Sequence, residues 1–283
     1  MVVLYLSLSI IATTLQSVFK KKVNFACPNK EISISFVITS FALLYFLVFS
    51  DLGGFTCEIL PYAMGLAVCY ATAAATGVLA IACGSMAFTH IVLAYSRIIP
   101  ILYSLIFLGE KLNAIQIAGV VCLALSLVFT YYKREKGSAV SLKWVIYAVI
   151  LFISNGMCSV FMRMQQIRFD GKVDGIYMVV SLAVVLVILL AMALIREGKG
   201  FFQVFKKGIL WCGLCGASNG IANYFTLLCL PLMAGSVFYP VSSAGDLVLT
   251  FLFSLVIFKE RFTKNQTVGF VLGIIAMIFV NLK

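Results

Sequence analysis

The sequence predicts an all-α integral membrane protein whose ten transmembrane helices form an inverted repeat of five plus five. Three observations lead to this fold class: an apolar composition, apolar runs of membrane-spanning length, and a segment that occurs twice. Hydrophobic residues make up 63% of the chain and charged residues 11%, whereas a soluble domain has about 25% charged residues. A surface this apolar cannot face water, but it can face lipid.

The apolar runs are each long enough to cross a hydrocarbon core, which takes about 20 helical residues. In lipid every backbone N–H and C=O must be bonded within its segment or inside a closed barrel. Continuous runs favour helices over the alternating, roughly ten-residue strands of a barrel. We expect helices near residues 2–19, 32–50, 60–83, 86–108, 114–132, 143–163, 176–195, 208–229, 233–258 and 265–282.

The repeated segment covers residues 101–133 and 251–283, which align without a gap, with nine of 33 positions identical. The identical pairs include Ser104 and Ser254, Glu110 and Glu260, Gln116 and Gln266, and Gly119 and Gly269. Hydrophobic residues can match by composition alone, but a shared Glu followed by Gln and Gly at fixed spacing rarely does. The chain is therefore predicted to consist of two repeats, 1–137 and 138–283.

Five helices per repeat is an odd number, so the two repeats must cross the membrane in opposite directions, which makes an inverted repeat. The tripeptide Ser-Val-Phe at 17–19 recurs at 159–161, near the ends of the first and sixth predicted helices. Duplication of this kind in a membrane protein indicates transport.

Basic residues divide unequally between the two sets of loops. One set holds 15: Lys20, Lys21, Lys22, Lys30, Lys133, Arg134, Lys136, Lys143, Arg196, Lys199, Lys206, Lys207, Lys259, Arg261 and Lys264. The other set holds 5: Lys111, Arg163, Arg168, Lys172 and Lys283. The positive-inside rule places the first set in the cytoplasm and both termini outside. Topology explains these charges, so we expect no nucleic-acid partner.

The nine cysteines do not form the pattern of a disulfide framework, because seven lie within or at the ends of apolar helices. Cys212 and Cys215 have metal-ligand spacing, but no second pair or nearby histidine completes four ligands. We therefore expect no metal site and no cofactor, and interpret these cysteines as small residues that let helices approach.

Two formally charged residues fall inside predicted helices, Arg97 and Asp246. The 150-residue shift carries position 97 to 247, beside Asp246, so the two charges occupy nearly equivalent places in the repeats. Such residues avoid lipid and face a cavity or each other. Three interpretations remain open: a structural salt bridge, a contact with substrate, or a side chain that reaches the interface. A bridge that opens when substrate arrives would combine the first two.

Other polar residues complete the candidate site. The predicted substrate-binding set is Arg97, Asp246, Asn155, Asn219, Asn223, Tyr224 and Ser243. A hydrogen bond between helices is an equal alternative for each uncharged member. The predicted structural set is Glu110, Glu260, Gly119, Gly269 and Pro100. We expect each glutamate to stabilise the N-terminal amides of the helix that follows it.

The repeated segment resembles the EamA-like family of the drug/metabolite transporter superfamily. The resemblance rests on Pro100 ten residues before Glu110, Gly-Glu-Lys-Leu at 109–112 and Lys-Glu-Arg-Phe at 259–262. It also rests on the Gln and Gly that follow each of these, and on Asn-Tyr-Phe-Thr-Leu-Leu at 223–228. It implies a central cavity lined by the first, third, fourth, sixth, eighth and ninth helices, and transport by alternating access.

This chain departs from the family in two respects. Thr250 stands where the second repeat often has proline, and the loop charges place the termini outside, whereas the family is usually drawn with them inside. A carboxylate in the first helix, which small multidrug relatives use, is absent from the first and sixth predicted helices.

We expect a secondary transporter of a small polar or zwitterionic metabolite such as an amino acid, in the bacterial inner membrane. An exporter of cationic or aromatic compounds, with Asp246 as the cation site, is the alternative. No Walker loop is present, so we expect no ATP hydrolysis by this chain. An intramembrane enzyme would need a nucleophile–base pair or a metal cluster, and one histidine with two buried charges disfavours it. The expected partners are the substrate and the bilayer, and a homodimer is compatible with this reading.

Overall fold

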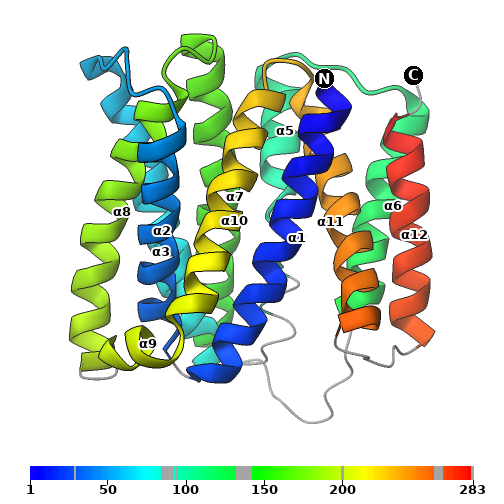
Figure 1. Ribbon diagram of the computed structural model, residues 1–283. Coiled ribbons are helices and arrows are strands. Elements are labelled where there is room, and N and C mark those ends of the chain that lie inside the picture. The colour runs from blue at the N-terminus through cyan, green and yellow to red at the C-terminus, as the bar shows by residue number, and fades with distance from the viewer. Residues whose placement is uncertain are drawn as a thin grey trace. The chain divides into compact units, whose positions relative to one another are not determined.

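The computed structural model describes residues 1–28, 30–83, 89, 92–93, 95–131, 142–198, 201–257 and 264–281, and every regular element in these ranges is helical (Figure 1). The helices are α1 (Val2–Ala26), α2 (Glu31–Phe49), η1 (Cys57–Ile59), α3 (Leu60–Cys83), α5 (Ile98–Phe107), α6 (Ala114–Tyr131), α7 (Leu142–Phe169), α8 (Asp174–Glu197), α9 (Phe201–Lys207), α10 (Ile209–Cys229), α11 (Gly235–Ile257) and α12 (Lys264–Asn281).

The helical fold class is confirmed for the described part of the chain, where each predicted apolar run contains a helix. Within the described residues, five helical stretches are long and apolar enough to cross a membrane: Val2–Ala26, Glu31–Phe49, Cys57–Ala80, Leu142–Phe169 and Asp174–Glu197. They fit a membrane-embedded helical protein. The count of ten spans and their inverted relation stay predictions.

The helices pack into two compact units. Unit 1 contains residues 1–75 and 161–232, and unit 2 contains residues 76–160 and 233–283. Each unit therefore contains residues of both predicted repeats, and α3 and α7 contribute residues to both units. Within a unit, helices in equivalent positions of the two repeats pack together: α2 with α8 in unit 1, and α5 with α11 and α6 with α12 in unit 2.

Unit 1 is built by close contact between α10 and its neighbours α1 and α2. A Cβ at Gly216 would lie 2.4 Å from the carbonyl oxygen of Ile38, so only glycine allows α10 to approach α2 this closely. On the α1 side, the Ser9 hydroxyl lies 3.2 Å from the carbonyl oxygen of Ala222 and 2.9 Å from the Thr226 hydroxyl. Both of these contacts between α1 and α10 join uncharged groups.

In unit 1, the N-terminus of α2 is held by a carboxylate from α8. Glu197 accepts hydrogen bonds from the backbone amides of Ile32 and Ser33, at 3.0 and 3.1 Å, and from the Ser33 hydroxyl. The first amides of a helix have no hydrogen-bond acceptor within it, so this carboxylate accepts from donors that would otherwise be buried without a partner.

Unit 2 uses the same device, with Glu110 in the role of Glu197. The Glu110 carboxylate accepts hydrogen bonds from the amides of Gly235 and Ser236, at 3.1 and 2.7 Å, at the start of α11. We expected Glu110 to stabilise the helix that follows it, α6, but α6 begins with a reciprocal cap between Asn113 and Gln116. The equivalent Glu260 lies outside the described residues.

The pair α6 and α12 completes unit 2. The Ser126 hydroxyl donates a 2.6 Å hydrogen bond to the Gly269 carbonyl, and Gly119 and Gly269 are both buried. A Cβ at Gly273 would lie 2.7 Å from a methyl group of Leu247, so α12 also approaches α11 through a glycine. These contacts place α11 between α5 and α12, with its polar residues toward the start of α5.

Candidate functional site

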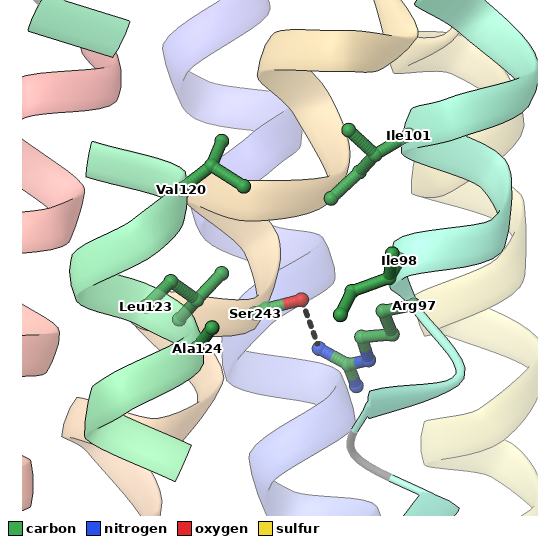
Figure 2. A pocket seen from close by; sticks show the side chains of 7 residues that line it. All are labelled: Arg97, Ile98, Ile101, Val120, Leu123, Ala124 and Ser243. Carbon is green, nitrogen blue, oxygen red and sulfur yellow. Dashed lines mark hydrogen bonds between the residues drawn. The ribbon is translucent and has the colours of Figure 1, made fainter. Parts of the chain in front are cut away.

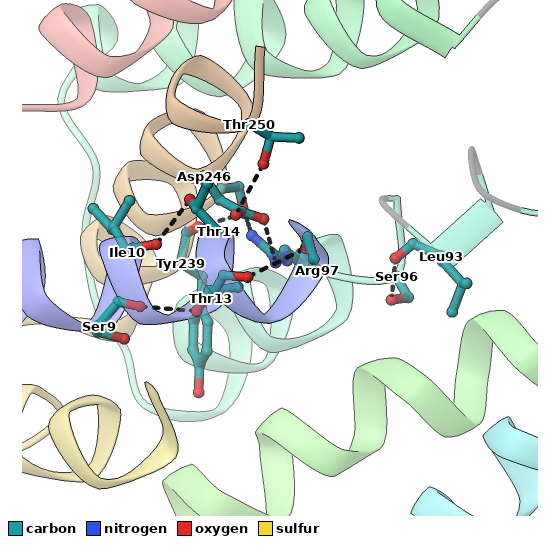
Figure 3. A network of polar contacts seen from close by, with 12 residues as sticks. Ser9, Ile10, Thr13, Thr14, Leu93, Ser96, Arg97, Tyr239, Asp246 and Thr250 are labelled. Atoms are coloured by element: carbon teal, nitrogen blue, oxygen red, sulfur yellow. Dashed lines mark hydrogen bonds and ion pairs between the residues drawn. The ribbon is translucent and has the colours of Figure 1, made fainter. Parts of the chain in front are cut away.

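The candidate site lies in unit 2, where α5 begins beside α11. Arg97 is the residue immediately before α5. Its Nη1 donates a 3.1 Å hydrogen bond to the Ser243 hydroxyl (Figure 2). Its Nη2 lies 3.3 Å from Oδ2 of Asp246 (Figure 3). Residues three apart on a helix share a face, which is why Ser243 and Asp246 of α11 both reach one guanidinium. The structure thus brings together three residues of the predicted substrate-binding set.

The ion pair is only partly buried. The Arg97 side chain is 36% exposed and the Asp246 side chain 20% exposed. Its 3.3 Å separation is longer than the 2.7–2.9 Å typical of strong charge-assisted hydrogen bonds. Arg97 divides its two Nη groups between two acceptors, so it does not grip Asp246 in the bidentate manner that a carboxylate can accept. A ligand carboxylate could therefore compete for this guanidinium.

Further hydrogen bonds, within α11 and between α11 and α7, hold the residues that accept from Arg97. The Ser243 hydroxyl donates to the Tyr239 carbonyl at 2.7 Å, which leaves its oxygen as the acceptor for Arg97. The Tyr239 hydroxyl in turn donates to the Ser159 carbonyl of α7 at 3.0 Å. Thr250 is one turn beyond Asp246, with its hydroxyl 3.5 Å from Oδ1 (Figure 3).

Asn155 of α7 reaches the site through Ser96. Its Nδ2 donates a 2.6 Å hydrogen bond to the Ser96 hydroxyl, which donates at 2.7 Å to the Leu93 carbonyl. The neighbouring Gly156 permits this approach, since a Cβ there would lie 2.7 Å from the Ser96 carbonyl oxygen and 2.5 Å from a methyl group of Ile99. α7 therefore fixes the turn that carries Arg97.

Ser96 and Gly156 were not in the predicted set. Their sequence signal is weak: an Asn-Gly pair inside an apolar helix and a serine next to a charged residue. Pro100, in the predicted structural set, is buried in the first turn of α5, where its missing N–H removes no helical hydrogen bond.

A small hollow adjoins the guanidinium. It lies between α5, α6 and α11, is partly open, and has room for little more than one water-sized group. Its lining consists of Arg97, Ile98, Ile101, Val120, Leu123, Ala124 and Ser243 (Figure 2). The hollow is therefore a mostly apolar depression beside one charged group, and it is smaller than a ligand site.

The other predicted substrate-binding residues lie on α10 in unit 1. Asn223 donates a 3.0 Å hydrogen bond to Asn219 one turn earlier. Tyr224 packs at steep angles against Tyr45 and Phe46, with ring centroids 6.3 and 6.5 Å away. The predicted set therefore separates into two groups, with Arg97, Asn155, Ser243 and Asp246 in unit 2.

Three cysteines of unit 1 pack as apolar residues. Cys27, Cys212 and Cys215 are buried free thiols in one hydrophobic cluster. Burial raises the pKa of the Cys27 thiol, an effect that the charge of Lys207 partly opposes. Among the described residues, no three His, Cys, Asp or Glu side chains are grouped as metal ligands.

Comparison with known proteins places the fold but not the activity. No protein-family model matches the chain, and no curated protein matches it in sequence. A solved structure described only as "Crystal structure of protein" matches with a TM-score of 0.74 and 14% sequence identity, over 99% of this chain and 96% of the other. At this identity the likeness shows a shared helical fold and nothing about substrate.

Proposed function

We propose that this chain is a secondary transporter that moves a small polar or zwitterionic metabolite, such as an amino acid, across a membrane by alternating access. The observation that carries the proposal is the partly exposed ion pair between Arg97 and Asp246. Charged groups inside membrane proteins are energetically costly and mark substrate or ion pathways. The resemblance to the EamA-like family supports the same assignment.

The geometry suits a zwitterion for an electrostatic reason. In the ion pair the two opposite charges neutralise each other. A zwitterion would place its carboxylate on Arg97 and its ammonium on Asp246, so each charge exchanges one partner for another. Neither state then leaves an uncompensated charge in a low dielectric, which would be strongly unfavourable. A small substrate side chain would contact the apolar residues beside the guanidinium.

The alternative substrate class is a cationic or aromatic compound, with Asp246 as its anchor. Such a cation would have to displace Arg97 and leave the guanidinium without its carboxylate. This loss of a counter-charge favours the zwitterion.

The proposed location is the bacterial inner membrane, with the lysine-rich loops in the cytoplasm and both chain termini outside. The partners are then the substrate and the surrounding lipid. A homodimer is compatible with this arrangement and is not required by it.

The experiment is uptake by the purified chain in liposomes without ATP. Radiolabelled zwitterionic, cationic and anionic metabolites are compared, with protein-free liposomes as the control. We expect saturable uptake of one or more zwitterions, and we expect the same compounds to raise the melting temperature in detergent. Uptake restricted to cations would replace the proposal by its alternative. Absence of uptake for all three classes would contradict transport.

A further inference from the structure

One end of unit 1 gathers basic side chains around the short helix α9. α9 packs against α2, α8 and α10, and Glu197 at the end of α8 binds the start of α2, so these helix ends lie together. The described basic residues near them are Lys20, Lys21, Lys22, Lys30, Arg196, Lys206 and Lys207. The described acidic residues near them are Glu31 and Glu197, and the Glu197 carboxylate accepts hydrogen bonds from backbone amides of α2. This end therefore carries a clear excess of positive charge.

α9 has two different faces. Phe201 and Val204 are buried at 7% and 0% exposure, and Phe201 packs against Phe36 of α2 with centroids 5.4 Å apart. Phe202 and Phe205 are 61% and 38% exposed. Phe205 directly precedes Lys206 and Lys207, and Phe202 lies one helical turn before Lys206. Exposed aromatic rings beside lysines are typical of a helix that lies in the membrane–water interface.

Trp211 is a second indication that this end of unit 1 lies at the membrane–water interface. It lies in the first turn of α10, and Nζ of Lys22 stands 4.3 Å from its ring centroid. Tryptophan is enriched at the headgroup level, where its ring is apolar and its surroundings are wet. The preceding Leu210 is 66% exposed, so lipid-facing residues begin directly beside the basic ones.

We propose that α9, with Lys206, Lys207, Lys22 and Lys20, binds the headgroups of anionic phospholipids. The exposed rings of Phe202 and Phe205 enter the boundary between headgroups and acyl chains. A phosphate ion would use the lysines alone, whereas a phospholipid uses both the lysines and the rings. Basic side chains next to a membrane surface each contribute to attraction of anionic lipid, and salt weakens that attraction. The inference does not depend on the transported substrate.

The test uses Trp211 as its own probe. A full-length W144F variant leaves Trp211 as the remaining tryptophan, since the chain contains two. It is placed in phosphatidylcholine bilayers with a small, equal fraction of either brominated phosphatidylglycerol or brominated phosphatidylcholine. We expect the anionic lipid to quench Trp211 at least about twofold more strongly, and the difference to shrink at high salt. Equal quenching by the two lipids overturns the proposal.

Charge variants in the W144F background locate the effect. K206Q/K207Q should abolish the difference between the two lipids, whereas K111Q/K172Q, which removes two positive charges elsewhere, should keep it. Loss of the difference in both variants, or in neither, contradicts the assignment to α9. In detergent, phosphatidylglycerol should raise the melting temperature of the W144F protein more than inorganic phosphate does. An equal rise with phosphate would identify an anion site instead of a lipid site.

Discussion

Two arginine–carboxylate pairs in this protein have the same chemistry and nearly the same length. Arg97 and Asp246 in unit 2 are 3.3 Å apart, and Arg168 and Glu58 in unit 1 are 3.2 Å apart. They differ in surroundings, because the first pair is 36% and 20% exposed and the second 60% and 66%. Exposed pairs contribute about 0–1 kcal/mol, so distance alone says little about importance. Location within the helix packing is what assigns a role to the first pair.

The largest expected difference between the two pairs is the loss of stability when the arginine of each is removed. We expect Arg97→Met to lower the free energy of unfolding by roughly 1–3 kcal/mol, because Asp246 loses its counter-charge in a partly buried place. This is less than the 3–5 kcal/mol of a fully buried pair because the Arg97 side chain is 36% exposed. Arg168→Met should change stability by less than about 0.5 kcal/mol. Denaturant unfolding of both variants in one detergent measures the difference.

A double-mutant cycle sharpens the same comparison. Asp246→Leu added to Arg97→Met should cost less than the sum of the single changes, with a coupling energy of about 1 kcal/mol or more. The cycle at Arg168 and Glu58 should give a coupling energy near zero. Additive effects at Arg97 and Asp246 would show that the two side chains do not depend on each other.

The close approach of α7 to the Arg97 turn should be nearly as sensitive. Gly156→Ala places a Cβ 2.7 Å from the Ser96 carbonyl oxygen, and we expect a loss of roughly 1–3 kcal/mol from overpacking. Gly77→Ala is the matched control, because its Cβ would meet the nearest side chain at an ordinary 3.6 Å. That change should be neutral, or stabilising by up to about 1 kcal/mol through helix propensity. Similar melting temperatures for the two variants would contradict the tight contact.

The carboxylates that hold helix N-termini allow a comparison between the units. We expect Glu197→Gln and Glu110→Gln each to lower stability by roughly 0.5–2 kcal/mol, because the charge that faces the helix amides is lost. Glu197 should show the larger effect because it also accepts the Ser33 hydroxyl. Exposed Glu58→Gln is the control and should shift the melting temperature least. A larger effect at Glu58 than at either of the others would refute the capping role.

The smallest expected effect concerns thiol reactivity in unit 1. Cys27 is 5% exposed and its pKa is raised by burial, so less of it is thiolate at a given pH. Cys57, also in unit 1, is exposed. Maleimide labelling followed by peptide mass spectrometry should modify Cys57 first, with Cys27 reacting more slowly and more readily as the pH rises. Faster labelling of Cys27 would contradict its packing in the cluster.

The repeat indicated that Arg97 and Asp246 lie near each other, and a salt bridge between them was one of three interpretations that the sequence left open. A shift of 150 residues placed the two charges at nearly equivalent positions, and helical spacing then added Ser243. No such relation connects Asn155 with Ser96, since their contact depends on the register of α7 against α5. Gly156 was missed for the same reason, because a close contact through glycine can be recognised only when the neighbouring helix is known.

The repeat did not predict how the helices divide into two compact units. Residues 1–137 and 138–283 remain the predicted duplication, yet each compact unit combines stretches from both. Sequence similarity reports common origin, whereas packing is decided by complementary surfaces. α9 was also absent from the predicted helices, because Lys206 and Lys207 interrupt the apolar run that hydropathy detects. α1 likewise continues through three lysines, which have good helix propensity.

The central claim is that Arg97 and Asp246 bind the transported substrate. The most direct measurement is uptake of the identified zwitterion by liposomes that contain R97M/D246L or R168M/E58L, compared with the wild type at equal protein content. We predict that R168M/E58L transports normally, while R97M/D246L folds with a cooperative melting transition and transports nothing. Uptake by R97M/D246L at the wild-type rate would contradict the account and reduce the pair to a structural contact.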